Sequence, residues 1–137
     1  MNFAIVGATG NVGRKTIDIL EKSKIKISKL FLIASKKSAG KTITFKKKKI
    51  KIEALENYNF EKAKITIFAT GSIIAKKWAP IAAKKTIVID NSKYFRMEKN
   101  IALVVPEVNE NALKIYRKRK IIANPNCSTT QLVLVLK

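Results

Sequence analysis

Three glycines at three-residue spacing follow the first apolar run of the chain. Residues 3–6 (Phe-Ala-Ile-Val) are typical of a buried strand, and Gly7, Gly10 and Gly13 then lead into a helical pattern. Strand, glycine turn and helix is the arrangement by which an α/β protein brings its backbone close to a phosphate. We expect one glycine to form the turn, one to admit a pyrophosphate and one to let helix and strand pack closely. A tight turn without a ligand is the alternative.

Further buried strands follow, separated by helices and glycine-containing turns. We expect strands at residues 29–34, 64–69, 86–89, 103–105 and 121–123, and a hairpin from residues 42–45 and 50–54 with a lysine tip. This order predicts an α/β fold, a Rossmann-like doubly wound and mainly parallel sheet. Each of the five glycines is expected just after a strand, and none within a helix or strand.

The expected helices carry their own apolar residues. The first follows Gly13 and ends near Ser23, with Ile17, Ile19 and Leu20 on its apolar face. The second is expected to start at Ser72 as its cap and to be disturbed at Pro80, and its apolar residues are Ile73, Ile74, Trp78 and Ile81. We also expect a short helical turn at residues 57–62 and another helix at residues 110–118.

Length and composition favour one domain in a reducing compartment. With 137 residues, 47% of them hydrophobic, residues 1–137 are expected to form a single domain with a real core. The one cysteine, Cys127, excludes an internal disulfide. No apolar run approaches the roughly 20 residues of a membrane span, and no signal peptide is apparent. We therefore expect a cytoplasmic protein without a membrane partner.

The net charge of +20, from 29 basic and 9 acidic residues, raises the possibility of a nucleic-acid partner. Only four basic residues are arginine, the better reader of phosphates and bases. The aromatic residues lie mostly in apolar patterns and not between lysines. Abundant isoleucine and asparagine beside the lysines suggest a coding bias. Specific nucleic-acid binding is therefore the less favoured alternative.

The loop after the second expected strand indicates which dinucleotide binds. Residues 35–41 (Ser-Lys-Lys-Ser-Ala-Gly-Lys) are basic and rich in hydroxyls, and no acidic residue lies between Glu21 and Glu53. An acid here would hold the ribose 2′-hydroxyl of NAD, whereas a basic loop accepts the 2′-phosphate of NADP. The sequence predicts NADP(H), and an ordinary solvated lysine loop is the alternative.

The lone cysteine lies near a predicted helix start. Asn126, Ser128 and Thr129 are good helix caps, which places Cys127 at or just before a helix N-terminus. Free N–H groups there favour a thiolate and can also bind an oxyanion. A nucleophilic cysteine beside a dinucleotide suggests covalent redox chemistry through a thioester. From the local sequence alone, a structural cysteine is equally plausible.

Five motifs in order resemble aspartate-semialdehyde dehydrogenase. They are residues 7–13 (Gly-Ala-Thr-Gly-Asn-Val-Gly), 34–41 (Ala-Ser-Lys-Lys-Ser-Ala-Gly-Lys), 90–92 (Asp-Asn-Ser) with 95–97 (Phe-Arg-Met), 103–109 (Leu-Val-Val-Pro-Glu-Val-Asn) and 124–131 (Asn-Pro-Asn-Cys-Ser-Thr-Thr-Gln). The sister family, N-acetyl-glutamyl-phosphate reductase, typically has glycine before the cysteine and an aromatic residue after it. Asn126 and Ser128 favour the aspartate family.

The resemblance implies a reaction: NADPH reduces β-aspartyl phosphate to aspartate semialdehyde, on the routes to lysine, diaminopimelate, threonine and methionine. It implies that Cys127 forms the acyl thioester, while Arg96 and Asn126 hold the substrate phosphate. Residues 9–12 would surround the pyrophosphate, and Lys37 and Ser38 would meet the 2′-phosphate. The implied cofactor-binding set is Gly7, Thr9, Gly10, Asn11, Val12, Gly13, Ser35, Lys37, Ser38, Thr70 and Gly71.

The chain also departs from that family. It resembles only the N-terminal half, and the family's C-terminal catalytic and dimerisation domain supplies a glutamine, an arginine for the substrate carboxylate and a histidine acid/base. This chain has no histidine. Ala102 stands where proline is usual, and Lys85 where glycine is usual. We therefore expect the chain alone to be inactive, with a full-length homodimer or a complementary C-terminal chain as partner. A stand-alone NADP(H)-binding module is the alternative.

Overall fold

A single sheet of eight strands runs through the computed structural model, which describes residues 1–137. The strand order is β3-β4-β2-β1-β5-β6-β8-β7. The strands are β1 (Asn2–Val6), β2 (Lys29–Ala34), β3 (Thr42–Phe45), β4 (Lys48–Ala54), β5 (Ile65–Phe68), β6 (Ile87–Asp90), β7 (Ala102–Leu103) and β8 (Ile121–Ala123). Only β3 runs antiparallel to its neighbour. The predicted doubly wound, mainly parallel sheet is confirmed.

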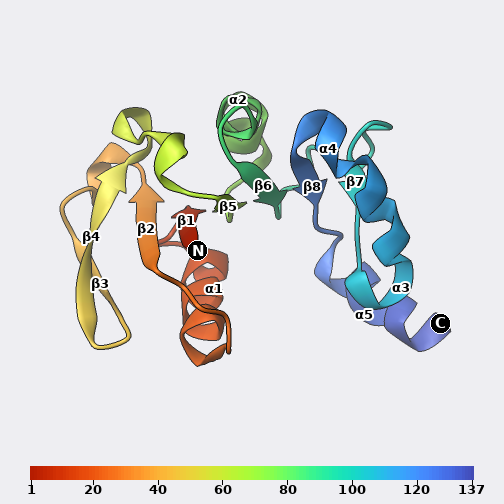
Figure 1. Ribbon diagram of the computed structural model, residues 1–137, viewed down its shortest axis with the longest axis horizontal. Coiled ribbons are helices and arrows are strands. Elements are labelled where there is room, and N and C mark those ends of the chain that lie inside the picture. The colour runs from red at the N-terminus through yellow and green to blue at the C-terminus, as the bar shows by residue number, and fades with distance from the viewer.

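The chain reverses its direction of winding between β1 and β5. It leaves β1 toward β2 on one side and later returns to place β5 on the other side of β1. The helix α1 (Asn11–Lys22) covers one face of the sheet and α2 (Ser72–Ala83) covers the opposite face (Figure 1). A reversal of this kind leaves a crevice at the carboxyl ends of the strands, where open α/β sheets bind ligands.

The first helix starts earlier than predicted. It begins at Asn11, so Gly13 lies inside α1 and not before it. The expectation that no glycine lies within a helix was wrong, as was the placing of Gly40, which follows the 3₁₀ helix η1 (Lys36–Ser38). On the buried face, Ile17 and Leu20 were predicted correctly, but Ile19 is 58% exposed.

The second helix packs through alanines. Its buried residues are Ala75, Ala79, Ala82 and Ala83, whereas Ile73, Ile74 and Ile81 are exposed. Small side chains let this helix lie close to the sheet, so the prediction was wrong for the three isoleucines, whereas the predicted Trp78 is half-buried and packs against the core. The helix continues through Pro80, and its cap is Gly71 and not Ser72.

The predicted hairpin is present, with β4 starting two residues earlier than expected. β3 and β4 pair from Thr42 with Lys51 to Phe45 with Lys48. The turn residues Lys46 and Lys47 have φ of 47° and 64°, so both adopt the left-handed conformation that a two-residue hairpin turn requires. The charged tip projects at the edge of the sheet.

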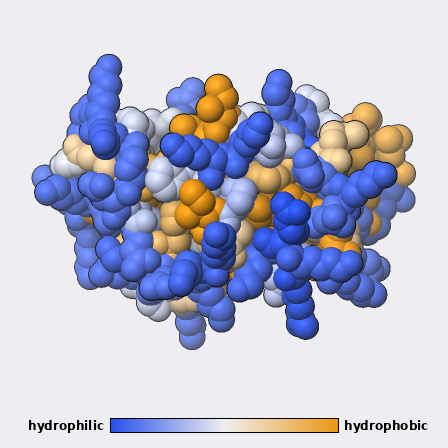
Figure 2. Space-filling view, turned by 90° about the horizontal axis from the view of Figure 1, so that it is seen from above, coloured by the Kyte–Doolittle hydropathy of each residue, from blue (hydrophilic) through white to orange (hydrophobic).

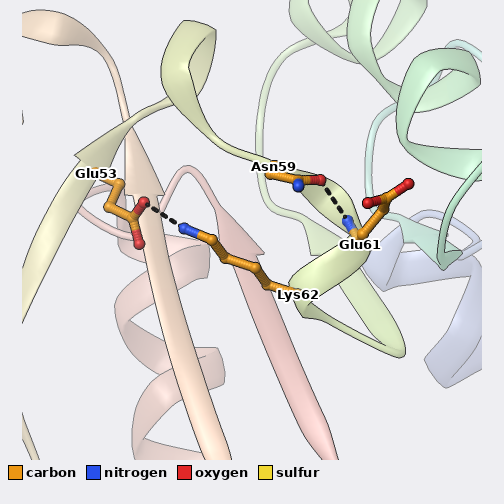
Figure 3. Close-up of polar contacts among 4 residues, drawn as sticks. All are labelled: Glu53, Asn59, Glu61 and Lys62. Atoms are coloured by element: carbon orange, nitrogen blue, oxygen red, sulfur yellow. Dashed lines mark hydrogen bonds and ion pairs between the residues drawn. The ribbon is translucent and has the colours of Figure 1, made fainter.

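Residues 55–62 form two 3₁₀ helices, η2 (Leu55–Asn57) and η3 (Phe60–Lys62), where one helical turn was predicted. Lys62 pairs with Glu53 at 3.6 Å, and the Asn59 carboxamide oxygen accepts a hydrogen bond from the Glu61 N–H at 2.9 Å (Figure 3). These contacts fix the connection that leads from β4 into β5.

Residues 102–119 are more broken than predicted. The expected strand is only Ala102–Leu103, and the expected helix is two pieces, η4 (Glu110–Ile115) and α4 (Tyr116–Arg119), preceded by a short helix that was not predicted, α3 (Pro106–Asn109). The Asn109 side chain accepts from the Val105 N–H at 2.8 Å and donates to the Leu103 carbonyl at 2.9 Å. This side chain takes the place of the backbone bonds that would lengthen the strand.

The last helix, α5 (Cys127–Leu136), buries none of its residues. Leu132, Leu134, Val135 and Leu136 are all exposed. The face shown in Figure 2 is mostly hydrophilic, with smaller hydrophobic patches between the hydrophilic side chains. None of the helices combines the length and the hydropathy needed to cross a bilayer.

We predict that Gly13→Ala lowers the free energy of unfolding by more than about 1 kcal/mol, because the added Cβ would lie 2.2 Å from the Gly7 carbonyl oxygen. Gly71→Ala is the matched control, since nothing lies within 4 Å of its added Cβ. Urea unfolding measures both. Equal losses in the two variants would contradict the close packing of Gly13.

Candidate functional site: a dinucleotide crevice beside a cysteine

Four loops meet at one edge of the sheet. Because β1, β5, β6 and β8 are parallel, their carboxyl ends lie together. The glycine turn follows β1, Thr70 and Gly71 follow β5, and Asn91 and Asn124 follow β6 and β8. With strands about 4.8 Å apart, the loops after β1 and β8 are separated by three spacings, or about 14 Å. A ligand that reaches both must be elongated.

The glycine turn is shaped by contacts that no side chain would permit. Gly7 has φ of +87°, donates its N–H to the Ile33 carbonyl at 2.8 Å, and would place a Cβ 2.3 Å from the Ala69 carbonyl oxygen. Gly13 packs as closely against the Gly7 carbonyl. A Cβ added at Gly10 would lie 3.5 Å from the same Gly7 carbonyl oxygen, which is an ordinary contact, and Gly10 is exposed at the start of α1. The three predicted roles of the glycines fit these surroundings.

The first turn of α1 has unused donors. The N–H groups of Asn11, Val12 and Gly13 donate to no group of the protein. Gly10 offers no side-chain cap, and no acidic residue lies in the first turn. The positive end of the helix is therefore open to an anion, which is the arrangement that binds a pyrophosphate.

A cavity of about 200 Å³ lies in the crevice between β1 and β5. Its walls combine the predicted Gly7, Thr9, Ser35 and Thr70 with other residues, which are Val6, Ala34, Leu55, Glu56, Ile74 and Trp78. The Thr70 hydroxyl is buried without a hydrogen-bond partner. An unpaired buried hydroxyl is costly, and a polar ligand would satisfy it. The residues present therefore fit a dinucleotide.

The structure separates some predicted cofactor residues from that cavity. Lys37 and Ser38 lie in η1 directly after β2, and neither they nor Gly71 line the cavity. Conversely, sequence reasoning missed Glu56, Ile74 and Trp78. Ile74 is exposed on α2, whereas Trp78 is half-buried and also packs against the core, so the apolar pattern alone could not assign either residue to the crevice.

Arg96 joins the loops on the other side of the edge. Its Nε donates to the Asn124 carbonyl and its Nη2 to the Asn91 carbonyl, both at 3.0 Å. The Asn124 side chain donates to the Asn91 carboxamide oxygen at 2.9 Å, and Asn91 donates to the Phe68 carbonyl at 3.1 Å. The loops after β5, β6 and β8 are thus bound together. Since a guanidinium has five N–H groups, three remain on Arg96 for a ligand.

Cys127 is the first residue of α5, as predicted. Its side chain is exposed, which excludes the alternative of a buried structural cysteine. Asn126 is the helix cap: its carboxamide oxygen accepts from the Ser128 N–H at 2.9 Å and lies 3.9 Å from the Cys127 sulfur. The N–H groups of Cys127 and Thr129 have no acceptor in the protein. An exposed thiol therefore sits among free backbone donors.

The buried carboxyl group of Asp90 holds the start of the loop after β6. Asp90 is fully buried at the end of β6, where it accepts a hydrogen bond from the Ser92 hydroxyl at 2.6 Å; its second oxygen has no partner. Ser92 in turn accepts from the Tyr94 N–H at 3.2 Å. Burial raises the pKa of Asp90, although the hydrogen bonds to Ser92 and the charge of Arg96 oppose the shift.

A doubly wound sheet, a glycine turn with open donors and a crevice at the reversal of winding define a dinucleotide-binding Rossmann domain. The family model described as "Semialdehyde dehydrogenase, NAD binding domain" matches residues 2–116. The chain belongs to this family.

Two relatives carry a more specific name than the family model. The chain is 44% identical over 137 residues to aspartate-semialdehyde dehydrogenase 2 of Vibrio cholerae, covering 99% of the chain and 41% of that protein. It is 48% identical over 136 residues to aspartate-semialdehyde dehydrogenase of Aquifex aeolicus, covering 98% of the chain and 40% of that protein. The chain thus spans about two fifths of the length of these relatives.

Solved structures with the same enzyme name resemble the fold of this chain. The crystal structure of aspartate semialdehyde dehydrogenase II of Vibrio cholerae complexed with ASA superposes with a TM-score of 0.97 at 44% identity, covering 99% of this chain and 45% of that one. The Candida albicans aspartate semialdehyde dehydrogenase with NADP has a TM-score of 0.80 at 27% identity, with the same coverage. The resemblance drawn from the five motifs is confirmed.

We predict that Asp90→Asn is more stable than the native chain at pH 7. Because the folded state holds the Asp90 proton more tightly than the unfolded chain, native stability falls as pH rises past the ordinary aspartate pKa of 3.8. The advantage of the variant should therefore shrink toward pH 3. Thermal unfolding between pH 3 and 8 measures it, with Asp18→Asn on exposed α1 as control. A loss of stability at pH 7 would mean that the charged form is favoured.

Proposed function

We propose that the chain is the NADPH-binding part of an aspartate-semialdehyde dehydrogenase that converts β-aspartyl phosphate to aspartate semialdehyde in amino-acid biosynthesis. The observation that carries the proposal is Cys127, which lies at the N-terminus of α5 on the same sheet edge as the glycine turn. The names of the relatives, and the titles that mention ASA and NADP, support the substrate and the cofactor.

The cofactor would lie across the reversal of winding. The open N–H groups of residues 11–13 would hold its pyrophosphate, and the Thr70 hydroxyl would gain a partner. The basic η1 would meet a 2′-phosphate through Lys37 and Ser38. The carboxylate in the cavity, Glu56, follows β4 and not β2, so it does not stand where NAD-specific domains carry their acid.

Cys127 would act as the nucleophile. Its sulfur attacks the carbonyl carbon of the acyl phosphate, a C–S bond forms, and the C–O bond to phosphate breaks with its electron pair leaving on phosphate. The free N–H groups of Cys127 and Thr129 are suited to stabilise the oxyanion. A bound nicotinamide would supply the hydride that reduces the resulting thioester, and the C–S bond would then break to release the aldehyde and return the sulfur of Cys127 as a thiolate.

Arg96 and Asn126 would hold the departing phosphate. The braced guanidinium keeps three N–H donors free, and the Asn126 amide keeps its NH₂ because only the oxygen serves the cap. Bracing by the Asn91 and Asn124 carbonyls fixes the orientation of the guanidinium before the substrate arrives, which reduces the cost of ordering it.

The chain alone would not complete a catalytic cycle. No histidine is available as acid/base, and the relatives are more than twice as long. We therefore propose that residues 1–137 form the NADP-binding domain and that a second domain, in the same or another chain, supplies proton transfer, substrate carboxylate binding and dimer contacts. A stand-alone NADP(H)-binding module is the second candidate, favoured by the lack of histidine.

Calorimetric titration with NADPH and NADH tests the cofactor. We predict tighter binding of NADPH, and a preference reduced at least about tenfold in Lys37→Ala/Ser38→Ala, since a charged hydrogen bond contributes about 1.5–3 kcal/mol. Lys47→Ala, with the same loss of charge at the hairpin tip, should keep the preference. The chain should oxidise NADPH no faster with β-aspartyl phosphate than without it. Equal affinities for the two cofactors in the folded native chain would overturn the NADP assignment.

A further inference from the structure

A second basic site lies at the opposite edge of the sheet from the cofactor crevice. Two neighbouring clefts, of about 450 and 310 Å³, open where β5, β6 and β8 begin. The first is lined by the cations Lys64, Lys85, Arg117 and Lys120. The second shares Arg117 and Lys120 and adds Lys84, Lys118 and Arg119. No carboxylate lines either cleft.

The backbone holds these cations in place. The Lys64 carbonyl accepts from the Ile87 N–H at 3.1 Å, and the Lys120 carbonyl accepts from the Val88 N–H at 2.8 Å. Lys120 adopts the left-handed conformation, with φ of 52°, and donates its N–H to the Tyr116 carbonyl. The backbone therefore fixes where these cationic side chains emerge, at strand ends and a helix end.

The charge is largely uncompensated. Of the cations in these clefts only Lys85 forms an ion pair, with Glu61 at 2.6 Å. The helices α2 and α4 end here, and their carbonyl ends attract cations. A helix C-terminus is equivalent to about half a negative charge, so two of them offset only about one positive charge. A net repulsion remains that an anionic ligand would relieve.

The arginines distinguish this site from the general lysine surface. The chain has four arginines; Arg14 and Arg96 belong to the cofactor and cysteine regions, and the other two, Arg117 and Arg119, both line these clefts. A third cleft beside the hairpin is also basic, but its cations are lysines alone. Arginine presents a planar fork that matches phosphate oxygens in pairs.

We propose that these paired clefts bind a small polyanion with at least two adjacent phosphate groups. Two clefts that share Arg117 and Lys120 suit a compact ligand that places one phosphate in each. A long nucleic-acid backbone would instead need an extended basic stripe. The site is independent of the proposed dehydrogenase function, because it lies at the amino ends of the strands.

Calorimetric titration with sodium tripolyphosphate, in about 0.15 M salt and with NADPH saturating its own crevice, tests the proposal. We expect binding of one tripolyphosphate per chain, and much weaker binding of inorganic phosphate. Arg117→Gln/Arg119→Gln should weaken the affinity at least about tenfold, since both arginines would donate charge-assisted hydrogen bonds to the anion. Lys47→Gln/Lys49→Gln removes the same charge at the hairpin and should change the affinity less than about twofold.

The variant Arg117→Lys/Arg119→Lys keeps the charge and is a control for unfolding of α4, which carries both arginines. It should bind less tightly than the native chain but more tightly than the glutamine variant, with unchanged circular dichroism. Equal losses in the glutamine and hairpin variants would mean that net charge alone attracts the anion, and would overturn the site. So would the absence of binding to the folded chain. A single-stranded oligonucleotide that displaces tripolyphosphate and binds more tightly would assign the clefts to nucleic acid instead.

Discussion

The contact between Gly7 and Gly13 is the constraint on which the cofactor crevice depends. With no side chain on either residue, the first turn of α1 lies against the carbonyl that ends β1. That approach aims the free N–H groups of the helix at the carboxyl edge of the sheet. A methyl group at Gly13 would push the helix away from that carbonyl, and one at Gly7 would collide with the Ala69 carbonyl after β5, so either change would disrupt the crevice.

A second set of contacts organises the other half of the same edge. Arg96 takes its place from two carbonyls, Asn124 and Asn91 join through their amides, and Asp90 anchors the loop through Ser92. These residues come from two strands that are neighbours in the sheet but more than thirty residues apart in the chain. This arrangement leaves the buried carboxyl group of Asp90 with one oxygen that has no hydrogen-bond partner. This edge of the sheet is thus more polar than the core beneath it.

Much of this arrangement was predictable from local sequence. The glycine spacing, the buried strands and the caps around Cys127 predict the fold class and place the thiol at a helix start, because each depends on residues close together in the chain. The faces of the helices were harder to predict. Ile74 and Trp78 look like core by periodicity, yet alanines bury the helix: Ile74 is exposed and lines the crevice, and Trp78 both lines it and packs against the core. The Glu56 contribution and the Arg96 brace depend on tertiary contacts, which no local pattern contains. The roles of Lys37, Ser38 and Arg96 toward a ligand stay predictions.

The account's central claim is that a cofactor held by the glycine turn reaches Cys127. The rate at which iodoacetamide alkylates Cys127, the only cysteine, tests this when measured by mass spectrometry with and without saturating NADPH. We predict that NADPH slows alkylation, because its nicotinamide end must lie near the start of α5. Adenosine 2′,5′-bisphosphate, which would fill only the adenine end, should leave the rate unchanged. An unchanged rate with NADPH shown to be bound would contradict the account.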